Sequence, residues 1–339
     1  MSASDGSRAV ADEPGELAAA AEIARTLLTN LERVVLGKTD VLRLVVAAFA
    51  ARGHVLLEDV PGTAKTMLAR ALAGSVEGTQ AVRIQCTPDL QPTDVTGLSV
   101  WDPPSRRFEF RPGPVFANVV LVDEINRALP KAQSALLEAM AERQVTVDGV
   151  TRPLPAPFFV IATENPIEQD GTFPLPEAQL DRFVIRTSLG YPALDEEIRI
   201  VEDQVHGHPL DTLRPVVSRD ELARLFAAVE AVYVDPLLRG WIVELVRATR
   251  ELEELEVGAS VRGSLALDRL ARAVALVEGR AYATPDDVER LFVPVLAHRF
   301  VPSAETLAGS ESRTELLERI RTRCLERAPR PAPLWDTRV

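Results

Sequence analysis

The sequence predicts an α/β fold with a parallel sheet and a phosphate-binding loop, followed by a smaller all-α domain. Three observations support this prediction: a strand-turn-helix pattern over residues 54–73, two later apolar runs that end in polar residues, and a helical pattern from residue 195 onward. A chain of 339 residues is long enough for one large or two moderate domains. The expected divisions are a flexible N-terminal tail (1–16), the α/β core (17–192), the helical domain (193–327) and an irregular C-terminal tail (328–339).

Residues 54–73 are the stretch around which the rest of the chain is organised. The apolar run Val55–Leu57 predicts a strand, and the Ala/Leu-rich segment Met67–Ala73 predicts a helix. Free N–H groups and the dipole at the start of such a helix favour an anion. In a phosphate-binding loop, Lys65 would reach the β- and γ-phosphates and the Thr66 hydroxyl would bind magnesium. The whole turn between strand and helix reads Asp59-Val60-Pro61-Gly62-Thr63-Ala64-Lys65-Thr66.

This loop departs from the usual pattern, G-x-x-x-x-G-K-[ST], at two positions. Asp59 stands at the first glycine and Ala64 at the second, whereas Gly62 remains at the centre of the turn. A left-handed backbone at Ala64 would be strained. Taken alone, the loop is equally compatible with an ordinary β-turn-α connection that carries a solvated lysine.

Composition and charge limit the classes of function. Hydrophobic residues make up 46% of the chain, yet no run is long enough to cross a bilayer, and the N-terminus lacks the apolar core of a signal peptide. Cys86 and Cys324 lie far apart in sequence, which favours two reduced thiols in a cytoplasmic protein over a disulfide framework or a zinc site. The net charge of −12 opposes binding to nucleic acid or anionic membranes, so we expect neither as a partner.

Two helices are predicted before the first strand, over Leu17–Val35 and about Asp40–Ala51, with a break at Leu36-Gly37-Lys38. An apolar helix-turn that precedes a phosphate loop can pack on an adenine base; packing between helices alone is the alternative. After the loop helix, Ala81–Gln85 predicts a core strand. The runs Leu98–Trp101 and Phe108–Phe110 predict a hairpin, in which we expect Trp101 to be a packing residue.

Two acids follow the next predicted strand. The four consecutive apolar residues Val119–Val122 indicate a strand buried on both faces of a parallel sheet. Ligands of open α/β sheets bind outside the carboxyl ends of the strands, where Asp123 and Glu124 stand. Beside a phosphate loop, Asp123 would support magnesium and Glu124 would polarise the attacking water. For Asp123 the structural alternative is a strand-end helix cap.

A helix over Pro130–Arg143 and a hairpin over Gln144–Pro153 come next, the hairpin turning at Asp148-Gly149. The buried strand Phe158–Thr163 then leads to Asn165, which could hold the lytic water or the γ-phosphate, or could simply form a turn before Pro166.

Arg182 ends a short helix over residues 175–183, before a last strand at Val184–Thr187. It either points at the nucleotide of a neighbouring subunit or makes an ordinary salt bridge. Ser260–Ser264 opens a helix, so Arg262 could project from a helix start toward phosphate. From Asp195 onward we expect no strands, and we interpret Glu251–Glu256 as a solvated helix end. The predicted helices of this part are Asp195–Val205, Arg219–Ala231, Pro236–Arg250, Leu265–Glu278 and Pro285–Leu296.

In their order, these motifs closely resemble the MoxR family of AAA+ ATPases, over about residues 17–300. The matching stretches are Glu58–Thr66, Asp89–Gly97, Phe110–Asn118, Asp123–Ala128, Gln133–Glu142, Thr163–Pro166 and Leu175–Phe183. The resemblance implies an AAA+ P-loop core with a helical lid, and it makes the two hairpins similar to the helix-2 insert and the pre-sensor-1 hairpin. It also implies a ring, usually a hexamer, that works with a von Willebrand factor A domain protein on a client complex.

The resemblance further implies the roles of individual residues. Lys65 and Thr66 match Walker A, Asp123 and Glu124 match Walker B, and Asn165, Arg182 and Arg262 match sensor 1, the arginine finger and sensor 2. Magnesium would be held by Thr66 and Asp123. ATP would be bound by Gly37, Asp59, Val60, Pro61, Gly62, Thr63, Ala64, Lys65, Thr66 and Met67. Val261 stands where a proline is common in the family, and whether Arg262 acts in its own subunit or the next stays open.

The function expected from the sequence is therefore ATP hydrolysis at subunit interfaces, which drives chaperone-like remodelling or activation of partner proteins. One alternative is a nucleotide-gated binding scaffold with little hydrolysis, motivated by the altered loop. A second is a DNA-dependent ring motor, which the acidic composition opposes. A magnesium-chelatase-like subunit is a third.

Overall fold

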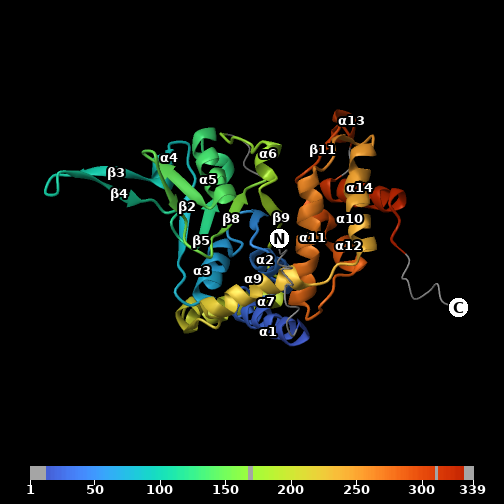
Figure 1. The fold of residues 1–339 in the computed structure, drawn as a ribbon, viewed down its shortest axis with the longest axis horizontal. Helices are drawn as coiled ribbons and strands as arrows, with labels where there is room; N and C mark the ends of the chain where they lie inside the picture. The colour runs from blue at the N-terminus through green and yellow to red at the C-terminus, as the bar shows by residue number, and fades with distance from the viewer. Residues whose placement is uncertain (1–12, 167–170, 310–311, 332–339) are drawn as a thin grey trace, which may run out of the picture.

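The computed structural model describes residues 13–166, 171–309 and 312–331. Its centre is a five-stranded parallel sheet in the order β2-β5-β8-β1-β9 (Figure 1). This arrangement confirms the predicted α/β fold. The strands span His54–Glu58 (β1), Ala81–Gln85 (β2), Val119–Asp123 (β5), Phe159–Glu164 (β8) and Phe183–Thr187 (β9).

The sheet is buried on both faces, because successive side chains of a strand point to opposite sides. In β5, Val119 and Leu121 join one hydrophobic cluster, whereas Val120 and Val122 join the other. All five residues of β5 are buried. The continuous apolar run in the sequence therefore reflects two cores that share one strand.

Helices cover both faces of the sheet. Figure 1 shows α4 and α5 above it, and α1, α2, α3 and α9 below it. The lower layer packs in the same cluster as Val55 and Leu57 of β1, and the upper layer packs against Val120 and Val122. These helices span Glu13–Glu32 (α1), Thr39–Ala50 (α2), Lys65–Ser75 (α3), Pro92–Thr96 (α4), Pro130–Glu142 (α5) and Arg219–Ala231 (α9).

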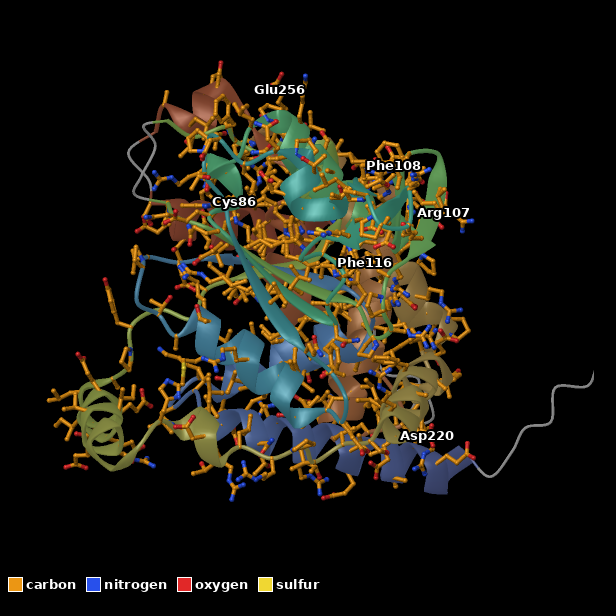
Figure 2. The ribbon with its side chains drawn as sticks, turned by 90° about the vertical axis from the view of Figure 1, so that its left-hand side faces the viewer. Cys86, Arg107, Phe108, Phe116, Asp220 and Glu256 are labelled. Carbon is orange, nitrogen blue, oxygen red and sulfur yellow. The ribbon has the colours of Figure 1, made fainter. Side chains whose placement is uncertain are left out.

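Two antiparallel hairpins are inserted into the core, as predicted. The strands β3 (Gly97–Asp102) and β4 (Arg107–Pro112) project far from the sheet (Figure 1). Near their tip Trp101 packs edge-to-face on Phe108, with ring centroids 5.3 Å apart, which confirms its packing role. Figure 2 labels Arg107 and Phe108 on this hairpin. The second hairpin joins β6 (Gln144–Val147) to β7 (Val150–Pro153).

Apart from two short helices between strands, the remaining helices follow the sheet in the chain. In Figure 1, α10, α11, α12 and α14 stand together to the right of the sheet, whereas α9 runs beneath it beside α1. Asp287 is fully buried among them and pairs with both Arg280 and Arg290. The elements not yet bounded are η1 (Ile125–Arg127), α6 (Glu177–Leu180), α7 (Leu194–His206), α8 (Pro209–Thr212), α10 (Pro236–Ala248), η2 (Thr249–Glu251), α11 (Val261–Val277), α12 (Pro285–Leu296), α13 (Ala304–Leu307) and α14 (Arg313–Arg327).

The prediction of no strands after residue 195 was wrong. A short strand, β10 (Leu255–Val257), pairs with β11 (Val301–Pro302). The interpretation of Glu251–Glu256 as a solvated helix end was also wrong, because Glu254 is 6% exposed and forms ion pairs with Arg319 and Arg323 of α14. The acids gave a misleading signal because their partners lie more than 60 residues away along the chain.

Helix α14 was missed, and one boundary differs from the expectation. α14 is highly charged and buries Leu316, Ile320 and Cys324 at helical spacing. α1 already begins at Glu13, inside the predicted N-terminal tail, while residues 1–12 of that tail lie outside the described residues. Residues 328–331 are irregular, as predicted, and 332–339 lie outside the described part as well.

Both cysteines are buried and free, in agreement with the expectation of reduced thiols. Burial, and then the charges of Asp123 and Glu124, raise the pKa of the Cys86 thiol to about 12. Within the described ranges, the helices are too short or too polar to span a bilayer.

We predict that His54 makes the stability of the fold depend on pH. Its Nδ1 accepts a hydrogen bond from the Val160 N–H at 3.1 Å, and its Nε2 faces the Met140 carbonyl at 3.2 Å, an arrangement that requires the neutral ring. Burial lowers the pKa of His54 from 6.5 to about 4. The unfolded chain therefore binds this proton first as the pH falls. The stabilisation is complete above pH 6.5 and is lost between 6.5 and 4, by on the order of 3 kcal/mol.

Urea unfolding at pH values from 7.5 to 4.5 measures this effect. His54→Asn, which keeps an acceptor for the Val160 N–H, should be less stable at pH 7.5 but should lose less stability on acidification than the parent chain. Equal pH slopes for the two proteins would contradict the assignment. His298, which is also buried with its pKa lowered by burial, is present in both and cancels in the comparison.

Candidate functional site

The loop between β1 and α3 has the backbone that a phosphate loop needs, at the cost of strain at one residue. Gly62 has φ +89° and leaves open space around its α-carbon. Ala64 adopts the left-handed conformation (φ 60°, ψ 17°) that was expected to be strained for a non-glycine residue. α3 begins immediately afterwards at Lys65, so its first N–H groups and its positive dipole end face the loop.

Asp59 anchors the loop to the chain that follows β9. Its carboxylate accepts hydrogen bonds of 2.8 Å from the Ser188 hydroxyl and from the N–H groups of Leu189 and Gly190. The side chain is 3% exposed, so its charge is satisfied almost entirely by these three donors. Asp59, which stands where the usual pattern has glycine, thus ties the phosphate loop to the chain at the end of β9, the strand next to β1 in the sheet.

Lys65 lies over the loop. Its ammonium donates to the carbonyls of Asp59 at 3.2 Å and Val60 at 3.1 Å, and the residue is 9% exposed. The Thr63 hydroxyl donates to the same Val60 carbonyl at 3.2 Å. A cation with no carboxylate partner in the described structure is thereby held beside a helix start, which is an arrangement suited to an anion.

A cavity of about 430 Å³ opens beside the loop, within the range of small-ligand sites. Of the predicted nucleotide-binding residues, Gly62, Thr63, Ala64 and Met67 line it, whereas Asp59, Val60, Pro61, Lys65 and Thr66 do not. Sequence reasoning missed the wall supplied by α7 and its flanks. The other lining residues are Arg33, Val34, Val35, Leu36, Lys38, Gly190, Tyr191, Pro192, Glu197, Ile200, Val201, Asp203 and Pro209.

Gly37 was predicted to contact the nucleotide, but its neighbours Leu36 and Lys38 line the cavity instead. Gly37 has φ +70°, and a Cβ there would meet the Glu196 carboxylate at under 2 Å. The missing side chain of Gly37 therefore allows the α1–α2 turn to approach the first turn of α7 closely. The Lys38 ammonium adds a hydrogen bond of 2.6 Å to the Tyr191 carbonyl.

The two acids at the end of β5 are held by the neighbouring strands. Asp123 pairs with Arg83 of β2 at 2.6 Å and accepts a hydrogen bond of 2.7 Å from the Thr163 hydroxyl of β8. The same hydroxyl accepts the Glu124 N–H at 2.8 Å, and Glu124 has left-handed φ and ψ values (56°, 53°). Its carboxylate accepts from Gln85 at 3.1 Å. Thr163 thus fixes both acids through one buried oxygen.

Thr163 and Arg83 were not singled out from the sequence. Thr163 gave a weak signal, a hydroxyl at the carboxyl end of an otherwise apolar strand next to the acid-bearing one. Asn165, which was singled out, follows β8 and is 8% exposed. The Asp59 N–H donates to the carbonyl of Glu164, so Asn165 lies at the same edge of the sheet as the loop.

The residues predicted for magnesium fit a site of the kind that this ion prefers. The described residues contain no group of three or more His, Cys, Asp or Glu side chains that could form an all-protein cage. Magnesium is usually bound by one or two protein oxygens together with substrate phosphates. Thr66, half-buried in the first turn of α3, and Asp123, at the end of β5, would provide such oxygens.

Arg182 and Arg262 lie elsewhere. Arg182 precedes β9, whose first residue pairs with His54, the first residue of β1. Both arginines line a cavity of about 330 Å³ that also includes His54. This cavity is at the amino edge of the sheet, whereas Lys65 follows the carboxyl end of β1. The structure thus does not bring the two arginines together with the phosphate loop of their own chain.

The arginine cavity is strongly basic. Arg182 donates to the Leu137 carbonyl at 3.0 Å, and Arg262 lies 3.5 Å from the Asp181 carboxylate. Burial, and then the charges of Arg143 and Arg52, lower the pKa of Arg269. Arg52, Arg143, Arg269 and Arg299 line the same cavity.

Comparisons with known proteins agree with this geometry. Residues 54–185 match the family described as "ATPase family associated with various cellular activities (AAA)", and residues 247–320 match the AAA lid domain. The chain is 50% identical to YeaC of Bacillus subtilis over 80% of its own length and 85% of that protein. It is 40% identical to Chaperone MoxR1 of Mycobacterium tuberculosis, over 90% and 82%. A crystal structure from Cytophaga hutchinsonii superposes with a TM-score of 0.85 at 33% identity, covering 94% of this chain and 98% of that one.

We predict that restoring glycine has opposite effects at the two altered loop positions. Asp59→Gly removes the acceptor of three donors and should lower the free energy of unfolding by about 3 kcal/mol or more. Ala64→Gly relieves the left-handed strain but frees the unfolded chain, so it should stabilise by no more than about 1 kcal/mol. Urea unfolding of the two variants measures both effects. Stabilisation by Asp59→Gly would contradict the anchoring role of Asp59.

We predict that Thr163→Val weakens the acid pair without changing the shape of the core. The change leaves one Asp123 oxygen and the Glu124 N–H without their partner, which costs about 1–3 kcal/mol of folding free energy. Thr163→Ser, which keeps the hydroxyl, is the matched control. Unfolding by denaturant compares the three chains. A valine variant as stable as the serine variant would show that the hydroxyl does not hold the acids.

Proposed function

We propose that this chain, which belongs to the MoxR family of AAA+ ATPases, binds ATP with Mg²⁺ at the phosphate loop and hydrolyses it at the interface between copies in a ring. The observation that carries the proposal is the separation of two sets of groups. The phosphate loop and the acids lie at the carboxyl edge of the sheet, and Arg182 and Arg262 lie at the amino edge.

At the carboxyl edge the roles follow from the contacts. The Lys65 ammonium and the N–H groups at the start of α3 would neutralise the phosphates. Thr66 and Asp123 would hold magnesium, which when bound would neutralise charge on the phosphates. Glu124, whose backbone is fixed by Thr163, would orient and polarise the attacking water, and Asn165 would hold that water near the γ-phosphate.

Completion of the site requires a second copy. Each strand of the sheet is about five residues long, so the two edges are separated by roughly 15 Å of strand. Arg182 of one chain would therefore contact the nucleotide bound by its neighbour. Arg262 would also act on the neighbour's nucleotide rather than on that of its own subunit. An arginine supplied in this way stabilises the charge that develops in the transition state and contributes about 10³–10⁵ in rate in related phosphoryl transfer.

The biological setting belongs to the same proposal. The relative named Chaperone MoxR1 supports chaperone-like remodelling or activation of partner proteins. The ring is taken to be a hexamer in the cytoplasm, working with a von Willebrand factor A domain protein on a client complex. Residues 17–192 would form the nucleotide-binding core and 193–327 the lid, whose closure would move the β3–β4 and β6–β7 hairpins.

A nucleotide-gated scaffold with little hydrolysis is the second candidate, and one contact favours it. The Asp123 carboxylate is already paired with Arg83 at 2.6 Å, so Arg83 competes for the oxygen that magnesium would use. Phosphate release by the parent chain no greater than that of a Lys65→Ala control would favour the scaffold over the ATPase.

Mixing two inactive variants tests the proposal. Glu124→Gln removes the water-activating acid but keeps Arg182, whereas Arg182→Ala does the reverse. Each should hydrolyse little ATP alone. A site is complete where an Arg182→Ala copy, which keeps Glu124, binds the nucleotide and a neighbouring Glu124→Gln copy supplies Arg182. In a random equimolar ring about one interface in four has this composition, so activity should return to about one quarter of the parent value.

The measurement is phosphate release by the mixture relative to each variant alone. No recovery on mixing, while both variants still assemble and bind a fluorescent ATP analogue, would contradict hydrolysis at the interface. Full activity of Arg182→Ala alone would remove the arginine from the mechanism.

A further inference from the structure

Helix α7 carries an apolar stripe that its own chain leaves exposed. Leu194, Ile198 and Val201 follow one another at helical spacing and are 74%, 49% and 63% exposed. Figure 2 shows α7 at the lower left, standing clear of the sheet and of the surrounding helices. Three large apolar side chains on one exposed helix face are typical of an interaction surface.

The same helix is strongly acidic. Its acids are Asp195, Glu196, Glu197, Glu202 and Asp203, and its one basic side chain in the described structure is Arg199. Within the described residues none of these acids forms an ion pair, although Glu196 accepts the Ala193 N–H at 2.8 Å as a helix cap. The charge on α7 is thus available to a partner with the opposite charge.

A groove of complementary character lies between α10 and α11. It has a volume of about 320 Å³. The buried Ile242 lines it, together with Val243, Val261 and Leu265, which are 42%, 65% and 65% exposed.

Three arginines line this groove as well. Arg239 shares Asp268 with Arg272, and Arg250 donates to the Ala259 carbonyl. Arg247 is exposed and has no carboxylate partner among the described residues. An apolar strip bordered by arginines is the counterpart of an apolar stripe bordered by acids.

The two surfaces belong to opposite sides of the nucleotide interface. Glu197, Ile200, Val201 and Asp203 of α7 line the cavity beside the phosphate loop, so the apolar stripe borders this cavity. Leu265 lines both the groove and the arginine cavity that contains Arg182 and Arg262. When the arginines of one copy approach the nucleotide of the next, the groove approaches α7 of that next copy.

We propose that α7 of one copy docks in the α10–α11 groove of the adjacent copy, with the apolar stripe against Val243, Val261 and Leu265 and the acids against Arg239 and Arg247. This inference rests on the proposed function, which brings two copies together at the nucleotide. The contact is heterologous, so it generates a closed ring when the rotation between copies is suitable.

Two variants that cannot complement themselves test the docking. The stripe variant carries Leu194→Asp and Ile198→Asp, and the groove variant carries Val243→Asp and Val261→Asp. All four side chains are exposed, so both variants should retain the fold. With Mg²⁺ and ATPγS, each variant alone should be monomeric. An equimolar mixture should form dimers, because the intact α7 of one variant fits the intact groove of the other. Multi-angle light scattering after size exclusion measures the masses.

Matched controls separate this proposal from the proposed function. Leu307→Asp, at a side chain that is 66% exposed on α13, should leave assembly unchanged. Both monomeric variants should bind a fluorescent ATP analogue within about threefold of the parent affinity, since neither alters the phosphate loop. Loss of binding by the parent chain would overturn the proposed function instead.

Assembly of either variant alone to the mass of the parent would overturn the docking proposal, as would a mixture that stays monomeric. A parent chain that binds the analogue but remains a monomer would overturn it too. Charge exchange gives a second measurement. Glu202→Arg and Arg247→Glu should each weaken assembly at least tenfold, and their mixture should restore part of it, whereas additive losses would contradict the pairing of these two surfaces.

Discussion

The polarity of the parallel sheet is the constraint on which the rest of the structure depends. Because all five strands run in one direction, their carboxyl ends meet at one edge and their amino ends at the other. The first edge receives the phosphate loop, Asp123 and Glu124, and the second receives Arg182 and Arg262. Within one chain, the residues predicted to bind the phosphates and the two predicted arginines therefore lie at opposite edges of the sheet.

Side-chain hydrogen bonds between neighbouring strands stabilise the carboxyl edge. Asp59 ties the phosphate loop to the chain after β9, and the Thr163 hydroxyl joins the backbone of Glu124 to the carboxylate of Asp123. The loop keeps its conformation without the two usual glycines, because the buried Asp59 carboxylate holds it in place and Ala64 adopts the left-handed backbone. The loop sequence is unusual, yet Lys65 still lies beside a helix start.

The sequence predicted those parts of this arrangement that depend on the pattern of neighbouring residues. The apolar run before Asp123 and the Asp-Gly turn of the second hairpin specify their elements through neighbouring residues alone. Contacts between distant segments could not be predicted. Glu254 looked solvated because its arginines lie on α14. The close approach of Glu196 to Gly37 could not be predicted either, because the two residues lie far apart along the chain. Thr163 was missed because its role depends on which strand lies next to β5.

We propose that one nucleotide is bound by the carboxyl edge of one copy and the amino edge of another. A cryo-electron microscopy structure of the parent chain with Mg²⁺ and a non-hydrolysable ATP analogue would test this arrangement. We expect a γ-phosphate between Lys65 of one copy and Arg182 of its neighbour, with Asp123 and Glu124 on the side of Lys65. A γ-phosphate contacted by Lys65 and Arg182 of the same chain, or a nucleotide bound away from the loop after β1, would contradict it.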